Sequence, residues 1–371
     1  MDNGAGPYTA GRHGQGSILS AKTAAFFDTI GKQKTPTIAD IAVRCNVSKA
    51  TVSRVLHSPH LVKAPTRALV ENALRESGYI YNAAAGDLAR RGNSFVGLIV
   101  AGLEDASFGD IVRSLQSMTM EHDMLIGDTT YSPFVEARLL QRMTERRAAG
   151  VVMISHCIGA EPAIREAQAK GTPVLLLWNL PEAEDLNFIA FDNSLAVSQA
   201  ADHLIELGHR RIGLVVGPYD RLLGARQRVD GLKVSLKKHG LPMDYRYVIM
   251  ADSGFTPEAG RLAMTRLLEI SPRPTAIILA GDILGVGAYA AVRQAGLRIP
   301  TDISLITLDD IDFAPHMDPP LTTVHLPTHE MGRLAGQYLA KVLNGEQDVC
   351  RICLPTSLMP RGSTAEPPHG D

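Results

Sequence analysis

The sequence has no apolar run that approaches the roughly 18 residues needed by a membrane-spanning helix. Its early apolar stretch, Ala24 to Phe27, is shorter than the roughly 7 to 15 apolar residues of a signal-peptide core. Cysteine is scarce, and the four cysteines are too scattered to form the disulfide framework of a small secreted domain. We therefore expect reduced thiols, no membrane partner and a cytoplasmic location.

The sequence also lacks the motifs of common catalytic and metal sites. It contains no G-x-S-x-G turn, H-E-x-x-H pair or phosphate-binding P-loop. Cys350 and Cys353 have the spacing of zinc ligands, but no second pair lies near them. Pro327 separates His325 from His329 and argues against a shared helical face. We expect no enzymatic activity, no cofactor and no metal.

Positive charge is concentrated near the amino terminus, although the whole chain has a net charge of -2. Residues 35 to 91 hold 8 Lys and Arg against 4 Asp and Glu, whereas the residues that follow hold 25 against 33. A small basic segment thus precedes a large acidic one. This asymmetry indicates that the basic segment contacts nucleic acid.

Local signals in the basic segment predict a helix-turn-helix. Thr37 and Asp40 have the spacing of a capping box, and Ser48 can cap a second helix. Asn46 between them tolerates the left-handed backbone of a tight turn. The second helix, VSKATVSRVL, would bury Val52, Val55 and Leu56 and expose Lys49, Ala50, Ser53 and Arg54. A third helix ending at Gly78 would bury Leu69, Val70, Ala73 and Leu74.

The rest of the chain has the pattern of an α/β protein. Apolar runs begin near residues 95, 150, 173, 212, 275 and 303 and alternate with amphipathic stretches long enough for crossover helices. Such runs are typical of strands that are buried on both faces of parallel sheets. Because these units exceed one comfortable sheet, we expect two doubly wound lobes with a cleft between them.

Several segments occur in an order that resembles the lactose-repressor/galactose-repressor (LacI/GalR) family. They include TIADIA, VSKATVSRVL, DNSLAVSQAADHLIELGHRRIGLVVG, RPTAIILAGDILGVGA and IPTDISLITLDD, and the similarity spans residues 37 to about 364. It implies a helix-turn-helix head and a periplasmic-binding-protein-like body. With the composition of the ends, the expected parts are a disordered arm (1–34), a DNA-binding domain (35–80), a hinge helix and linker (81–93), an effector-binding and dimerisation domain of two lobes (94–364) and a disordered tail (365–371).

The resemblance places the helix that follows Ser48 in the major groove of operator DNA. Lys49, Ala50 and Arg54 occupy the base-reading positions, and Arg54 can bond O6 and N7 of one guanine. The alternative for Arg54 is a side chain that only solvates the helix. The full DNA-contacting set is Thr37, Ser48, Lys49, Ala50, Thr51, Ser53, Arg54, His57, Asn82 and Leu88.

The segment from Asn82 to Ala89 matches the family's hinge helix, with Leu88 as a wedge for the minor groove. Leu88 could instead be a linker residue packed on the body. Gly86 and Asp87 stand where similar proteins usually have Arg-Ser. Glycine costs a helix about 1 kcal/mol relative to alanine, so we expect a hinge whose folding depends strongly on the state of the cleft.

In the body, the resemblance marks six effector-binding candidates: Phe108, Trp178, Arg221, Arg228, Asp282 and Asp309. Trp178 could equally be a core residue, and Asp282 could cap the helix that follows it. Arg228 with Asp309 suits a sugar or sugar acid, Trp178 suits a purine, and Arg221 as a second cation favours an anionic ligand slightly. Sugars or sugar derivatives, nucleobases and organic acids all stay open.

These features predict a sequence-specific transcriptional regulator, a repressor in particular. It would bind a pseudopalindromic operator as a homodimer, with a small effector in the cleft between the lobes changing its affinity for DNA. A different class of function is a cytoplasmic solute-binding protein or enzyme whose head only localises it.

Overall fold

The computed structural model describes residues 36–79, 95–105, 107–118, 122–251, 254–346 and 348–368. The chain divides into two compact units, Met1–Ala89 and Arg90–Asp371, here called the head and the body. The predicted arm (1–34) and the predicted hinge with Asn82, Gly86, Asp87 and Leu88 lie outside the described residues. None of the described helices combines the length and the apolar character of a membrane span.

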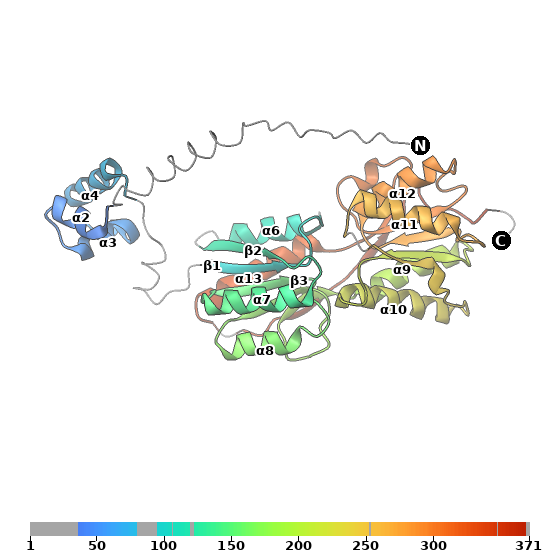
Figure 1. The fold of residues 1–371 in the computed structure, drawn as a ribbon, viewed down its shortest axis with the longest axis horizontal. Helices are drawn as coiled ribbons and strands as arrows, with labels where there is room; N and C mark the ends of the chain where they lie inside the picture. Colours follow the sequence, from blue (N-terminus) through green and yellow to red (C-terminus); the bar gives the residue numbers. More distant parts are fainter. Residues whose placement is uncertain are drawn as a thin grey trace, which may run out of the picture. The chain divides into compact units, whose positions relative to one another are not determined.

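The described part of the head, residues 36–79, contains three helices and one 3-10 turn (Figure 1). They are α2 (Ile38–Arg44), α3 (Lys49–His57), η1 (Pro59–Leu61) and α4 (Ala64–Ser77). Thr37 and Asp40 form the predicted capping box, in which the Thr37 backbone N–H donates to Asp40 Oδ2 at 2.8 Å. Asn46 has the left-handed φ of 51° required by the turn, and Gly78 ends α4 with a φ of 63°. The local sequence signals therefore set the start of α2, the turn after it and the end of α4.

The core of the head contains seven buried side chains: Ile41, Ala42, Cys45, Val52, Val55, Val70 and Ala73. Leu56 and Leu74 are half-buried against this core. The prediction that Leu69 is buried is wrong, because its side chain is 51% exposed. Leu69 lies one position from Val70, about 100° around the helix, and reaches the core only through its carbonyl, which accepts from Cys45 Sγ.

The body contains two six-stranded sheets. The first sheet has the order β11-β5-β4-β3-β1-β2 and the second has the order β12-β10-β9-β8-β6-β7. The strands are β1 (Phe95–Val100), β2 (Asp123–Asp128), β3 (Gly150–Ile154), β4 (Val174–Trp178), β5 (Phe188–Phe191), β6 (Ile212–Val216), β7 (Val248–Met250), β8 (Ala276–Leu279), β9 (Ser304–Asp309), β10 (Thr322–His325), β11 (Arg351–Leu354) and β12 (Ser357–Met359). All pairings are parallel except that of β10 with β12, as expected for doubly wound lobes.

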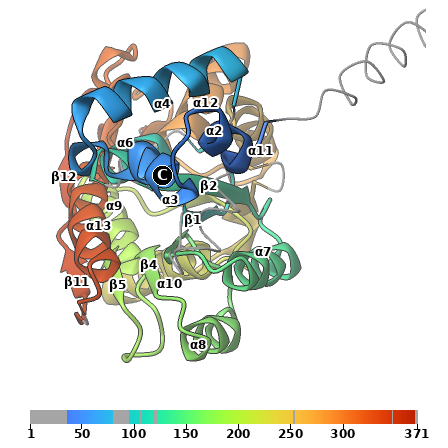
Figure 2. The same cartoon turned by 90° about the vertical axis from the view of Figure 1, so that its left-hand side faces the viewer.

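Helices cover both sheets. They are α6 (Ser107–Met118), α7 (Pro133–Glu145), α8 (Glu161–Ala169), α9 (Asn193–Glu206), α10 (Leu223–Lys238), α11 (Pro257–Glu269), α12 (Asp282–Gln294) and α13 (Thr328–Leu343), with 3-10 turns η2 (Tyr245–Tyr247) and η3 (Ala314–His316). In the first lobe, α6 packs on α13 and α7 packs on α8, and the two pairs lie on opposite sides of the strands (Figure 2). In the second lobe α9 packs on α10, and α11 packs on α12. The chain passes between the lobes after β5, after β10 and between β11 and β12.

Parallel pairing brings the carboxyl ends of several strands to one edge of each sheet. In the first sheet, Val100 lies opposite Ile154, and Ile154 lies opposite Leu177. In the second sheet, Leu279 lies opposite Thr307, two residues before the end of β9. The loops that leave these edges are where α/β proteins bind their ligands.

The chain beyond residue 364 is ordered against the second lobe as far as Pro368. The Ala365 carbonyl lies 2.9 Å from Nε2 of the buried His209 and also accepts from Ser304 Oγ. Pro367 lies against Gly208. The prediction of a disordered tail from residue 365 is therefore wrong for residues 365–368. The amino-acid composition indicated disorder there, because composition contains no information on hydrogen bonds to residues far away in the sequence.

Candidate functional site

The exposed face of α3 is the candidate DNA-contacting surface of the head. Val52 and Val55 are buried under the helix, whereas Lys49, Ala50 and Arg54 are exposed on it. The 3.6-residue period separates these two sets, because residues three and four apart share a face. The predicted base-reading side chains thus lie together in solvent on one helix.

Other predicted DNA contacts lie at the start of α3 or are partly covered. The Ser48 side chain accepts from the Thr51 backbone N–H at 3.1 Å, and their two hydroxyls lie 2.9 Å apart. Ser53 and His57 are half-buried. Thr37 is exposed, but its hydroxyl belongs to the capping box of α2. Ser48 and Thr51 therefore have a structural role in the cap, whatever they contact on DNA.

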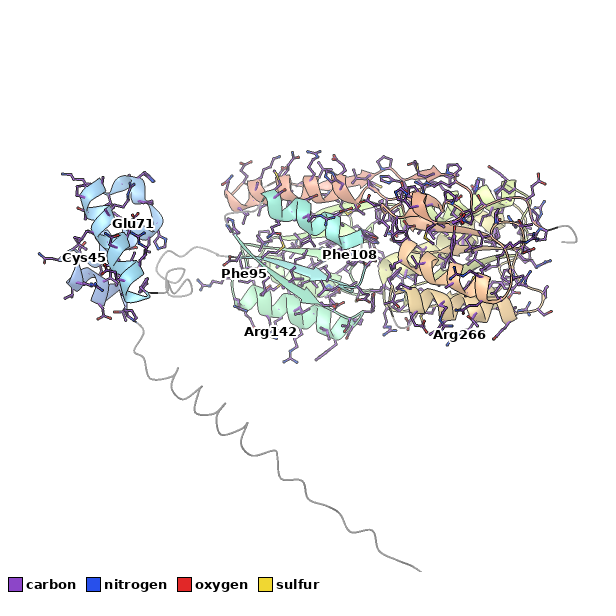
Figure 3. The ribbon with its side chains drawn as sticks, turned by 90° about the horizontal axis from the view of Figure 1, so that it is seen from above. Cys45, Glu71, Phe95, Phe108, Arg142 and Arg266 are labelled. Carbon is purple, nitrogen blue, oxygen red and sulfur yellow. The ribbon has the colours of Figure 1, made fainter. Side chains whose placement is uncertain are left out.

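A small cavity lies between the two lobes of the body, at the carboxyl ends of their strands. Its walls come from both lobes and consist of Ala101, Asp105, Phe108, Tyr131, Ser155, Trp178, Leu222, Gly224, Ala225, Arg228 and Phe255. Figure 3 labels Phe108 at the end of the first lobe that faces the second. This is the position predicted for a ligand by the topology of doubly wound sheets.

Three residues around the cavity have positive φ angles, a backbone conformation that residues other than glycine seldom adopt. Ser155 follows β3 with a φ of 58°, Trp178 ends β4 with 86°, and Asp309 ends β9 with 114°. Such conformations cost free energy and persist only where surrounding contacts hold them, which is typical of binding sites. They point to a cavity wall that is fixed in advance by its lobes.

Arg228 of α10 is the central cation of this site. It is buried, with Nε donating to Asn193 Oδ1 at 2.9 Å and Nη1 donating to the Ala280 carbonyl at 2.8 Å. Its guanidinium carbon lies 5.9 Å from the centre of the Trp178 ring. Nη2 is buried without a hydrogen-bond partner among the described residues. A buried donor without a partner is costly, so this atom is suited to meet a ligand.

Two buried carboxylates face Arg228. Asp309 Oδ2 accepts from the Asp282 backbone N–H at 3.3 Å, whereas Asp309 Oδ1 has no partner among the described residues. Burial raises the pKa of Asp309 well above its usual range, and the charges of Asp105 and Asp282 raise it further. Burial also raises the pKa of Asp105, against the lowering effect of Arg228. One guanidinium thus compensates two carboxylates from opposite lobes.

Aromatic rings form part of the cavity wall. Phe108 and Trp178 meet edge to face, with ring centroids 5.1 Å apart, and Trp178 also contacts Phe191. The Tyr131 hydroxyl donates to Glu104 Oε1 at 2.6 Å. Trp178 is both a core residue and a lining residue, so its two predicted roles are compatible.

Arg221, Asp282 and Asp309 are not among the residues that line the cavity, although Asp309 lies close enough to interact with Arg228 and Asp105. The Arg221 side chain is 42% exposed and pairs with Asp220. Asp282 is fully buried, bonds the hydroxyls of Thr307 and Thr323, and accepts from the Ile311 backbone N–H at 2.7 Å. It does not cap α12, whose N-cap is Gly281. Asp282 instead ties the start of α12 to the strands beside it.

The sequence prediction missed several lining residues, notably Asp105, Tyr131 and Phe255. Asp105 lies three residues before the predicted Phe108, at the end of the same strand-to-helix loop, and this position was an available signal. Tyr131 and Phe255 follow β2 and β7, two short strands without a strong apolar pattern. No local signal marks them.

Backbone contacts join the lobes beside the cavity. Cys157 of the first lobe forms an isolated antiparallel bridge with Leu222 of the second. The Ile158 N–H donates to the Arg221 carbonyl at 2.7 Å. The buried Glu136 holds this loop, because the Cys157 N–H lies 2.9 and 3.1 Å from its two carboxylate oxygens. Lobe contact and cavity therefore share one set of loops.

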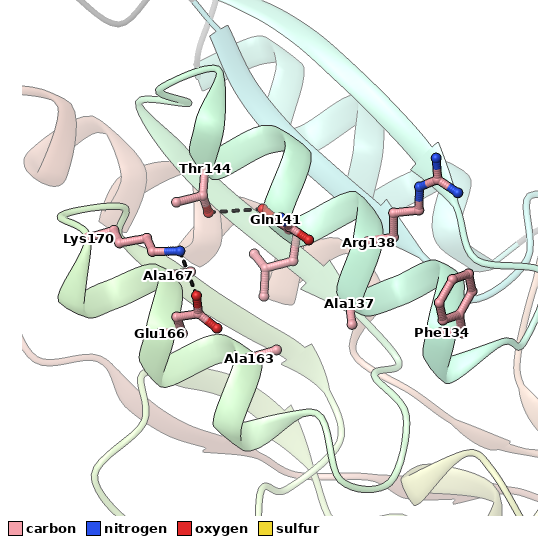
Figure 4. A pocket seen from close by; sticks show the side chains of 10 residues that line it. Phe134, Ala137, Arg138, Gln141, Thr144, Ala163, Glu166, Ala167 and Lys170 are labelled. Carbon is pink, nitrogen blue, oxygen red and sulfur yellow. Dashed lines mark hydrogen bonds and ion pairs between the residues drawn. The ribbon is translucent and has the colours of Figure 1, made fainter.

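A second hollow lies between α7 and α8 (Figure 4). Phe134, Arg138 and Gln141 of α7 are among its lining residues, and Glu166 pairs with Lys170 on α8. Its charged groups are exposed, and no unpaired buried atom is found there among the described residues. It therefore lacks the features that single out the interlobe cavity.

The two units together define a class of protein: regulators in which a helix-turn-helix head precedes a two-lobed body with a ligand cavity. Family models agree. Residues 37–82 match bacterial regulatory proteins of the lacI family, and residues 201–364 match a periplasmic binding protein-like domain.

Individual relatives lead to the same family. The repressor CytR of Escherichia coli K12 is 33% identical over 320 residues, 85% of this chain and 92% of CytR. PurR of Klebsiella pneumoniae strain 342 is 32% identical over 340 residues, 90% of this chain and 98% of PurR. The lac repressor dimer bound to operator and the anti-inducer ONPF has a TM-score of 0.75 at 26% identity and covers 90% of this chain and all of that one.

The chain belongs to the LacI family of bacterial regulatory proteins. It is a DNA-binding transcriptional regulator rather than an enzyme.

Proposed function

We propose that this protein is a cytoplasmic repressor that binds a pseudopalindromic operator as a homodimer and is controlled by a small molecule in the interlobe cavity. The observation that carries the DNA-binding part is the exposed face of α3, where Lys49, Ala50 and Arg54 lie opposite the buried Val52 and Val55. A helix of this kind fits the major groove, where arginine reads guanine. The solved lac repressor dimer bound to operator supports the dimeric part.

The DNA-binding proposal is tested by selecting genomic fragments with the purified full-length protein and titrating the selected site. We expect one palindrome to be enriched. Arg54→Ala should weaken binding roughly 5- to 150-fold, because a bidentate arginine–guanine pair contributes about 1–3 kcal/mol. Arg67→Ala is the matched control, since Arg67 lies on α4 and pairs with Glu71. Equal losses in both variants, or no enriched sequence, would contradict α3 as the reading helix.

The effector proposal depends on the two buried unpaired atoms, Arg228 Nη2 and Asp309 Oδ1. Both atoms belong to the second lobe, and a ligand with hydrogen-bonding groups can satisfy them while it contacts the cavity residues of the first lobe, such as Phe108 and Trp178. Arg228→Met and Asp309→Leu should therefore abolish the response of operator binding to the ligand while leaving DNA binding without ligand intact. A response that survives both substitutions would place the effector elsewhere.

A further inference from the structure

We infer that Asp105 makes the interlobe cavity selective for ligands that carry an amino group and excludes anionic ligands. This inference depends on the proposed function, in which the cavity holds the effector. It departs from the expectation, based on Arg221, of a slight preference for anions, because Arg221 is exposed and paired with Asp220.

The first step is the charge around the cavity: Asp105 and Arg228 line it, whereas Asp309 is buried nearby and interacts with both. Asp105 comes from the loop after β1, Asp309 from the end of β9, and Arg228 from α10. Asp105 and Asp309 are 9% and 6% exposed, and Arg228 is 4% exposed. Burial raises the pKa of both carboxyls, so Arg228 alone does not keep both of them ionised, and a positive charge from the ligand would complete the charge balance of this group.

The second step excludes anions. A carboxylate or phosphate on the ligand would add a negative charge beside Asp105 and Asp309, which among the described residues face Arg228 as their buried cation. Arg228 already uses Nε and Nη1 for Asn193 and Ala280, which leaves Nη2 for the ligand. Arg228 therefore cannot form a bidentate pair with an anion through two of its nitrogens.

The third step identifies the missing partner as a nitrogen donor. Among the described residues, Ser107 supplies the hydrogen bonds that Asp105 accepts, with its backbone N–H 3.0 Å from Oδ1. The Ser107 side chain also interacts with Asp309, whose Oδ1 has no partner within hydrogen-bonding geometry among the described residues. An ammonium group offers three donors in a small volume and supplies a positive charge, whereas the neutral amino group of a nucleobase offers two donors to the carboxylates without adding charge.

The aromatic walls fit this chemistry. Phe108, Trp178, Tyr131 and Phe255 line the cavity next to the carboxylates. Ring faces attract cations and stack on flat heterocycles. The amino group can therefore belong to an amino sugar or to an amino-substituted nucleoside, and binding measurements with both kinds of compound separate these two sources.

The test is a binding panel on the full-length protein, read by thermal unfolding and by operator affinity. The panel compares glucosamine with glucose and glucuronate, adenosine with inosine, and cytidine with uridine, within a library of equal numbers of amines, neutral polyols and carboxylates. We expect the ligands found to carry amino groups and to bind about 10- to 100-fold more tightly than their matched partners, as a charge-assisted hydrogen bond predicts.

Asp105→Asn tests the residue itself. It should reduce the preference for the amino compound over its neutral partner at least about tenfold and should allow carboxylates to bind. Asp110→Asn is the matched control, because Asp110 pairs with Arg113 on the surface of α6 and lies outside the cavity lining. This control should leave the preference unchanged.

Two kinds of contrary result can be told apart. Ligands that are anionic, or an amino preference that survives Asp105→Asn, would overturn the inference while leaving effector control in place. A library in which no compound shifts thermal unfolding or operator affinity would contradict effector control itself, and the inference with it.

Discussion

Trp178 is the chain's single tryptophan, and it is a wall of the cavity. Its ring contacts Phe108 and lies under the guanidinium of Arg228. Effector binding must therefore change the surroundings of the one indole in the protein. We predict a saturable change in tryptophan fluorescence whose midpoint equals that of the effector's influence on operator binding. Trp178→Phe should remove the optical signal without weakening DNA binding by the ligand-free protein, and a signal with a different midpoint would contradict this role.

Glu136 gives the body a dependence on pH near neutrality. Burial raises its pKa from 4.5 to about 7, against the lowering effect of the Cys157 N–H. Because the folded state holds this proton more tightly than the unfolded state, the contribution to stability is complete below pH 4.5 and is lost as pH rises through 7. A shift of this size corresponds to about 3 kcal/mol.

Glu136→Gln removes this titration. We predict that the difference in the free energy of unfolding between variant and parent changes by about 3 kcal/mol between pH 4.5 and pH 8, in favour of the variant at high pH. Denaturant titrations at several pH values measure it. Glu145→Gln, on an exposed turn of the same helix α7, is the control. A constant difference across this range would show that Glu136 does not titrate there.

At the scale of single residues, the resemblance to the LacI/GalR family correctly predicted which side chains lie at or beside the interlobe cavity. Arg228, Asp309, Trp178 and Phe108 do lie together. Asp105 was not predicted, because its significance arises only when the second lobe brings Asp309 and Arg228 to it. A carboxylate in a loop is ordinarily a solvated group, and the only local signal for this one is its place three residues before Phe108.

The helices of the head depend on their first residues. Thr37 and Asp40 bond each other in both directions at the start of α2, which has only seven residues. A short helix gains little from its own backbone bonds, so its cap matters more. Thr37→Ala should cost about 1 kcal/mol of local stability. Hydrogen exchange on the full-length protein should then show faster exchange in α2 but not in the body, and unchanged protection would deny the cap this role.

At the scale of elements, the sequence predicted what is local or strongly patterned. The caps at Thr37 and Ser48 are set by neighbours within three residues, and the six long apolar runs correspond to β1, β3, β4, β6, β8 and β9. Of the strands without a predicted run, β2 and β7 are edge strands with partly exposed side chains, whereas β5 and β10 lie inside the sheets and have only four residues each. An edge strand needs no continuous apolar run, so its signal is weak.

At the scale of the body as a whole, the number of βα units in the sequence predicts two lobes, but it does not predict how closely the two lobes approach each other. That closeness depends on small contacts between distant segments. The bridge of Cys157 with Leu222 is one such contact, and the close approach of Gly254 to Glu104 is another. Each contact joins two loops whose sequences have neither helical nor strand periodicity. Hydrophobic periodicity therefore does not predict these contacts.

Gly224 provides a test of whether lobe closure controls the regulator. It lies in the first turn of α10, and a Cβ there would come within 2.2 Å of Oδ1 of Asn179 in the first lobe. Asn179 is fully buried and donates to the His156 carbonyl, so it cannot easily move aside. We predict that Gly224→Ala forces the lobes apart, increases the radius of gyration in X-ray scattering and weakens effector binding at least about tenfold, which is 1.4 kcal/mol of closure energy. Gly109→Ala, in the first turn of α6 with open space around it, should change neither quantity. Normal effector binding in Gly224→Ala would mean that the ligand does not need the lobes to meet at this point.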